Sequence, residues 1–271
     1  MLNNINAMDR STPLANSVAL IQSSGTGKSR MVDEMAKLVF TIPFNVRLPD
    51  EPRAYPPEDY VVWEYLCKSQ VKKAEDGEVR AALFFQNLFS EVAIEVERVF
   101  SGRRIASPGE FASEWRNHLT KLGGAYREEL YKRVVQACKK VGLAEGPPQG
   151  SPRCSDGVRP TLDRLLAALY KFCDFRAVED DVKVMLYFDE AHELYGGSRG
   201  HRLYDIMQSS LSWSGPGKSP VFTIFVSTQL PPSAKFLQAP ITETAFDCHP
   251  GFPLGIGKWS LNQLGKLHFL A

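Results

Sequence analysis

Residues 17–37, SVALIQSSGTGKSRMVDEMAK, contain the pattern that decides the fold. Residues 18–22 form a short apolar run of strand character, and from Met31 onward apolar residues recur at helical spacing. Between them lies SSGTGKS, residues 23–29, so that a strand, a glycine-containing loop, a Lys-Ser pair and a helix follow one another. This order predicts a phosphate-binding loop.

Each residue type in this loop has a role in binding a nucleoside triphosphate. Gly25 and Gly27 allow backbone N–H groups to point at phosphate oxygens, and the following helix adds the partial positive charge of its N-terminus. Lys28 is expected to reach the β- and γ-phosphates, and the Ser29 hydroxyl is expected to bind Mg²⁺. The predicted nucleotide-binding residues are Ser24, Gly25, Thr26, Gly27, Lys28, Ser29 and Arg30.

One position departs from the common pattern, which has glycine where this chain has Gln22. Most amides of the expected cradle belong to residues 25–29, so Gln22 lowers the specificity of the match without removing the site. The alternative interpretation is a Gly-Lys-Ser turn that opens an ordinary surface helix.

A second motif, residues 182–190 (VKVMLYFDE), is an apolar strand that ends in two carboxylates. Asp189 is expected to hold Mg²⁺ through its water shell, and Glu190 is expected to orient and deprotonate the attacking water. An acidic pair after a strand is common and can merely start a turn. Here the acidic pair occurs together with the phosphate-binding loop, and both motifs would bind the same Mg-nucleotide. We therefore predict that Lys28 and Glu190 are catalytic residues and that Ser29 and Asp189 are metal ligands.

Residues 220–228 (PVFTIFVST) form another apolar run, typical of a buried parallel strand. Ser227 and Thr228 at its end are candidate sensors of the γ-phosphate, although Ser or Thr at a strand end also occurs as plain turn chemistry. Arg199 and Arg202 follow the acidic pair and are candidate arginine fingers, in cis or from a neighbouring copy. The alternative for both arginines is a solvated surface position.

Length, composition and net charge favour some classes of protein over others. With 271 residues, 44% of them hydrophobic and 23% charged, the chain can form one large α/β domain. A net charge of +1 gives no direct evidence for binding nucleic acid or a membrane surface, and argues against a nucleic-acid motor despite the D-E-A-H letters of residues 189–192. Five cysteines without a C-x-x-C pair favour a reducing intracellular location, cytoplasm or nucleus, and make zinc binding improbable. No apolar run is long enough to predict a membrane span.

The predicted fold is α/β, with a doubly wound, mainly parallel sheet and a helical insertion at about residues 75–175. We expect an unanchored, flexible lead-in at residues 1–16, a nucleotide-binding domain at 17–260, and the start of a C-terminal helix at 261–271, with the chain truncated there. A second strand is expected at 39–48, with Pro43 at an edge or bend. Helices are expected at 58–70, 81–100, 111–122, 126–141, 162–172 (with Thr161 as its cap) and 202–213.

Four segments together resemble a known family: QSSGTGKSRMVDEMA (22–36), FNVR (44–47), YFDEAHEL (187–194) and FVST (225–228). They look like the P-loop NTPase region of large fungal proteins that are related to the NTPase modules of Crinkler-type proteins. That region is similar to the AAA/STAND division. The resemblance runs from about residue 17 to 260 and rests mainly on the motifs. It implies ATP binding, a nucleotide switch or hydrolysis, and often a C-terminal effector segment. In this family Gln commonly stands at the position of Gln22.

Two functions are therefore expected to compete. The first is Mg²⁺-dependent ATP binding and hydrolysis that drives or switches an attached effector, with adenine preferred because no N-K-x-D element for guanine is present. The second is a regulatory switch that binds nucleotide without turnover. The expected cofactors are ATP and Mg²⁺, and the expected partners are nucleotide and either further copies of the chain or a missing C-terminal effector domain.

Overall fold

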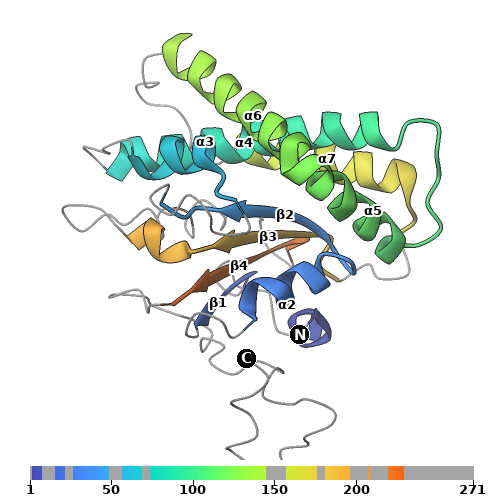
Figure 1. The fold of residues 1–271 in the computed structure, drawn as a ribbon. Coiled ribbons are helices and arrows are strands. Elements are labelled where there is room, and N and C mark those ends of the chain that lie inside the picture. The colour runs from blue at the N-terminus through green and yellow to red at the C-terminus, as the bar shows by residue number, and fades with distance from the viewer. Residues whose placement is uncertain are drawn as a thin grey trace, which may run out of the picture.

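The structure is a computed structural model that describes residues 2–7, 16–21, 27–48, 57–68, 74–144, 157–175, 181–195, 207 and 219–228. A parallel sheet lies at its centre, with helices on both faces (Figure 1). The strands are β1 (Ser17–Ile21), β2 (Phe40–Asn45), β3 (Val184–Asp189) and β4 (Val221–Ser227). Their order is β1-β4-β3-β2, and every neighbouring pair is parallel. The predicted α/β class with a mainly parallel sheet is confirmed, and the arrangement is compatible with a doubly wound fold.

The composition of the strands explains their central position. Every residue of β3 and β4 is buried, as expected where helices cover both faces of a parallel sheet. Alternate side chains divide between two apolar clusters. Phe44 and Phe188 lie on one face of the sheet, and their stacked ring centroids are 4.7 Å apart. Met185 and Tyr187 lie on the other face. Pro43 lies on β2, the strand at one edge of the described sheet, where its missing N–H is tolerated.

The helices separate into two groups on the two faces of the sheet (Figure 1). One group is the helical insertion between β2 and β3, and the other consists of a short N-terminal helix and the helix after β1. The helices are α1 (Leu2–Ala7), α2 (Lys28–Met35), α3 (Tyr60–Trp63) with the π-helical turn Glu64–Lys68, α4 (Ala74–Val99), α5 (Pro108–Thr120), α6 (Ala125–Ala144) and α7 (Val158–Phe172).

Helix α5 fixes the insertion to the edge of the sheet. The Trp115 ring stacks on Phe40 at 4.8 Å, and its indole N–H donates to the Thr41 carbonyl at 3.0 Å. Ser107 caps the helix by accepting a hydrogen bond from the Glu110 amide, with Pro108 in the first turn. The described helices of the insertion agree with the prediction of helical structure at about 75–175.

Two local predictions are wrong. Residues 2–7 are not unanchored: they form α1, where Ile5 is 2% exposed in the apolar cluster below the sheet, and the Asn6 side chain accepts a hydrogen bond from the Val182 amide. Thr161 is not a cap, because α7 begins at Val158, a fully buried residue whose packing extends the helix by a turn. The Thr161 hydroxyl instead donates to the Val158 carbonyl.

Two predicted helices lie outside the described residues: the helix at 202–213 apart from Met207, and the C-terminal helix at 261–271. Within the described helices, none is long and apolar enough to cross a membrane.

Glu95 on α4 is the buried centre of an ionic cluster that joins α4, α5 and α6. It lies 2.8 Å from His118 Nε2 and 2.8 Å from an Arg133 nitrogen, and it also pairs with Arg98. Burial acts to raise the pKa of Glu95, but hydrogen bonds from His118 and Arg98 and the charges of Arg98 and Arg133 lower it to about 2. A depressed carboxyl pKa stabilises the fold fully above pH 4.5, and this contribution is lost as the pH falls towards 2.

We therefore expect Glu95→Gln to lower the free energy of unfolding at pH 7 by about 3 kcal/mol, because it removes the negative charge of a buried carboxylate that pairs with Arg98 and Arg133 and contacts His118. The loss should shrink as the pH falls from 4.5 towards 2. Urea unfolding at several pH values measures both effects. Glu97→Gln is the matched control, since Glu97 is exposed on the same helix and should change stability by less than about 0.5 kcal/mol. Equal effects of the two variants at pH 7 would show that the cluster is not stabilising.

Candidate functional site

The carboxyl ends of all four strands meet at one edge of the sheet (Figure 1). The register places Asn45 of β2 opposite Asp189 of β3, and Ile21 of β1 opposite Ser227 of β4. Helix α2 also begins at this edge. Ligands of open parallel sheets generally bind outside the carboxyl ends of the strands, so this edge is the candidate ligand-binding site.

The start of α2 has the backbone geometry of an anion site. Gly27, its N-cap, has φ 81° and ψ 15°, a left-handed conformation that glycine adopts without strain. The first N–H groups of a helix have no acceptor within it, and the helix dipole adds partial positive charge there. The predicted binding residues Gly27, Lys28, Ser29 and Arg30 lie at this end, and Ser24, Gly25 and Thr26 lie outside the described residues.

A hydrogen bond joins the two sequence motifs. The Ser29 hydroxyl on α2 donates to Asp189 Oδ2 at the end of β3, with an O–O distance of 2.8 Å. Asp189 is only 3% exposed. The structure thus brings together the two predicted metal ligands, which are 160 positions apart in the chain.

Lys28 belongs to the same electrostatic unit. It is buried, and burial lowers its pKa, whereas the neighbouring carboxylates of Glu190 and Asp189 act in the opposite direction. A buried lysine beside two carboxylates at a helix N-terminus is a typical environment for a functional charge.

Glu190 follows β3 in an unusual conformation. Its φ is 54°, a left-handed value that is costly for a residue with a side chain. Its amide donates to Asp189 Oδ1 at 3.1 Å, and its carbonyl accepts from the Glu193 amide as the 3₁₀ turn Ala191–Tyr195 begins. This turn directs the chain away from the strand immediately after the acidic pair.

Arg47, just beyond β2, forms an ion pair with Glu190. The distance between Arg47 Nη2 and Glu190 Oε1 is 3.4 Å, and Arg47 Nη1 is buried without a hydrogen-bond partner within the described part of the chain. This ion pair could not be predicted from the sequence, because it depends on β2 lying next to β3. His192 Nδ1 also lies 3.4 Å from Glu190 Oε2, but without hydrogen-bond geometry.

The two candidate sensors differ in placement. Ser227 is the last residue of β4, between β1 and β3, and it is 1% exposed. By strand alternation its side chain is on the same face as Phe225, which packs with the helical insertion, whereas Asp189 faces α2. Thr228 follows the strand and is half-buried. The candidate arginine fingers Arg199 and Arg202 lie outside the described residues.

The donor atoms at this edge fit Mg²⁺ that shares its coordination with phosphate and water. The Ser29 hydroxyl and the Asp189 carboxylate are hard oxygen donors that already lie 2.8 Å apart. Among the described residues, no group of three or more His, Cys, Asp or Glu side chains could hold a metal ion. A cation here would need further oxygen ligands, from water or from a bound anion.

Comparison of the chain with models of known protein families, with curated proteins and with solved structures found no match.

The strained conformation of Glu190 leads to a stability prediction. Glu190→Gly should raise the free energy of unfolding by about 0.5–1 kcal/mol, because glycine adopts a positive φ without strain. Leu122→Gly is the control: Leu122 also has a positive φ, 52°, and its side chain is exposed, so the same change should give a similar gain. Urea unfolding tests both variants, and a loss of stability in Glu190→Gly alone would mean that its contacts outweigh the strain.

Proposed function

We propose that this chain binds Mg-ATP at the carboxyl edge of its sheet and hydrolyses it, as a P-loop NTPase. The observation that carries the proposal is the 2.8 Å hydrogen bond between Ser29 and Asp189. It joins a glycine-capped helix N-terminus to a strand-end carboxylate, and these are the two surfaces between which a Mg-triphosphate binds in such enzymes. The parallel pairing of all four strands further supports the proposal, since it places their carboxyl ends at that edge.

In this proposal, different residues bind the phosphates, hold the metal ion and position the Glu190 carboxylate. The amides at the start of α2 and the Lys28 ammonium group bind the phosphates, and Ser29 and Asp189 hold Mg²⁺. The ion, when bound, neutralises charge that develops on the phosphate oxygens. Arg47 fixes the Glu190 carboxylate at the edge of the site by their ion pair.

Hydrolysis itself requires one proton acceptor. Glu190 orients a water molecule in line with the γ-phosphorus and takes its proton, as the water oxygen bonds to phosphorus and the bond to the β–γ bridging oxygen breaks. ADP leaves with the electron pair of that bond, and inorganic phosphate is the second product. Adenine is proposed over guanine on the sequence alone.

The second candidate function is a nucleotide-binding switch that does not turn over. It is favoured by the Arg47–Glu190 ion pair, because a carboxylate oxygen that binds a guanidinium group is not available to bind and orient an attacking water molecule. In that case the bound nucleotide would change the state of the domain, and an effector segment or a further copy of the chain would read the change.

Glu190→Gln separates the two functions. If the chain is an ATPase, this variant should lose at least about 100-fold in turnover and keep its affinity for Mg-ATP within about threefold, because only the proton acceptor is removed. Phosphate release and calorimetry measure the two quantities. Glu193→Gln is the matched control, a nearby carboxylate on the same 3₁₀ turn that should change turnover by less than about threefold.

Two outcomes would change the conclusion. If wild type and Glu190→Gln both bind Mg-ATP and neither turns it over, the chain is a switch. If neither binds, both functions are wrong.

A further inference from the structure

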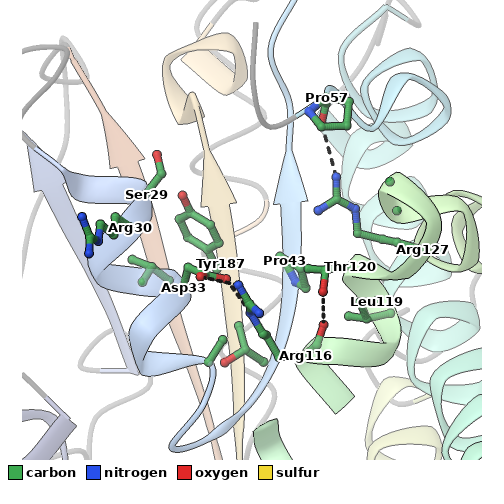
Figure 2. Close-up of a pocket in the computed structure, with 15 residues that line it drawn as sticks. Ser29, Arg30, Asp33, Pro43, Pro57, Arg116, Leu119, Thr120, Arg127 and Tyr187 are labelled. Atoms are coloured by element: carbon green, nitrogen blue, oxygen red, sulfur yellow. Dashed lines mark hydrogen bonds and ion pairs between the residues drawn. The ribbon is translucent and has the colours of Figure 1, made fainter. Parts of the chain in front are cut away.

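A cavity of about 440 Å³ lies between α2 and α5, on the α2 face of the sheet. In Figure 2, α2 forms one wall, β3 and β2 form the floor, and the end of α5 with the start of α6 forms the opposite wall. Thr120 and Gly123, at the turn from α5 to α6, are exposed members of the wall and mark the side that opens to solvent. The proposed nucleotide position is outside the strand ends, so the cavity is a separate space that borders this position at Ser29.

The volume of the cavity matches a small organic ligand. An apolar cavity of about 150 Å³ can hold one benzene molecule, and this cavity has about three times that volume. Its volume also lies within the range of small-molecule sites. A molecule of two or three rings therefore fits the available space.

The wall of the cavity is mainly apolar, and its apolar side chains come from four elements. They are Val32 and Ala36 of α2, Pro43 of β2, Leu119 of α5 and Tyr187 of β3. Water in such a space finds few hydrogen-bond partners. An apolar molecule that replaces this water gains free energy, because its own surface and that of the wall are both removed from water.

The charged side chains of the wall are already paired or turned away. Arg116 of α5 donates to both carboxylate oxygens of Asp33 on α2, at 2.9 and 2.6 Å (Figure 2). Arg127 of α6 pairs with the buried Asp59 carboxylate at 3.0 Å. The Arg30 side chain points away from the cavity (Figure 2). Among the described residues, the wall therefore presents neither an unpaired cation nor an unpaired carboxylate to a ligand.

The hydroxyl groups of the wall are also directed to the protein. Thr41 and Thr120 donate to backbone carbonyls two and four positions before them, at 2.9 and 3.1 Å. Ser29 donates to Asp189, and the Tyr187 hydroxyl points along β3 towards Ser29, so that the Tyr187 ring forms the floor (Figure 2). A charged ligand would lose its hydration here and find no counter-charge in return.

We propose that this cavity binds an uncharged, mainly apolar organic molecule of two or three rings, which enters past Thr120 and lies between α2 and α5. The driving force is the removal of apolar surface from water, and the paired charges of the wall exclude ions. The proposal goes beyond the nucleotide site and does not require that the chain hydrolyses ATP.

The probe for the full chain is N-phenyl-1-naphthylamine, an uncharged dye of three rings whose fluorescence rises in apolar surroundings. Fluorescence titration should show saturable, one-to-one binding. Saturating Mg-ATP should not displace the dye competitively, and Lys28→Ala should bind the dye as wild type does.

Three naphthalene compounds test the charge of the ligand by displacing the dye at pH 7. 2-Naphthalenemethanol is uncharged, 2-naphthoate is an anion, and 2-naphthylmethylammonium is a cation with the same ring system. The alcohol should displace the dye at least about tenfold more strongly than either ion, because an ion would be dehydrated without an unpaired counter-charge in the wall.

Asp33→Asn tests whether the paired charges cause this selectivity. The variant removes the carboxylate that pairs with Arg116, so displacement by 2-naphthoate should become at least about threefold stronger, and displacement by the alcohol should change less than about twofold. Asp163→Asn is the matched control. It removes a carboxylate that pairs with Arg159 on the exposed surface of α7, and it should leave displacement by all three compounds within about twofold.

A pair of tryptophan variants locates the bound dye. Thr120→Trp places a large side chain at the exposed rim of the cavity and should weaken dye binding at least about tenfold. Leu122→Trp is the matched control, because Leu122 is two positions further along the chain and its side chain is exposed. It should leave the affinity for the dye within about twofold.

Any of four results would overturn the proposal: no saturable binding of the dye, normal binding by Thr120→Trp, displacement by an ion that equals displacement by the alcohol, or competitive displacement by Mg-ATP. An unchanged response of Asp33→Asn to 2-naphthoate would overturn the role of the paired charges. The outcomes for the nucleotide are independent. If the dye binds as described and Mg-ATP does not bind, the cavity proposal stands and the proposed ATPase fails. If Mg-ATP binds and is hydrolysed but the dye does not bind, the ATPase stands and the cavity proposal fails.

Discussion

The hydrogen bond between Ser29 and Asp189 is the contact on which the functional interpretation depends. It exists because β1 and β3 are parallel members of one sheet, and because α2 starts where β3 ends. Both oxygens are held by rigid elements rather than by long loops. That arrangement is what a preorganised site for a divalent cation and a polyphosphate requires.

The path of the helical insertion determines which side chains lie near this edge. The helical insertion between β2 and β3 covers the opposite face of the sheet from α2, and its α5 passes round the β2 edge, where Trp115 binds the Thr41 carbonyl (Figure 1). The pairing of β2 with β3 brings Arg47 next to Glu190 at the strand ends. The path of α5 makes it face α2 across a cavity that Tyr187 lines.

The sequence predicted the local elements well, because a strand, a glycine turn and a helix leave patterns within a few residues. It also paired Ser29 with Asp189, since both serve one ligand in the predicted chemistry. It did not predict the role of Arg47 or the cavity at Tyr187, because these depend on the order of the strands and on the path of α5. The errors at residues 2–7 and at Thr161 have a similar origin: burial of Ile5 and Val158 against distant segments outweighed polar local sequence.

The most direct test of the account is a calorimetric titration of ATP into wild type and Lys28→Ala, with Mg²⁺ and with the ion removed by chelation. If a triphosphate and Mg²⁺ bind between the start of α2 and the acidic pair, wild type should bind Mg-ATP, and loss of either the lysine or the ion should weaken binding at least about tenfold. Lys37→Ala, which removes an exposed lysine just after α2, should leave the affinity within about twofold. Binding that is equally strong without Lys28 and without Mg²⁺ would contradict the account.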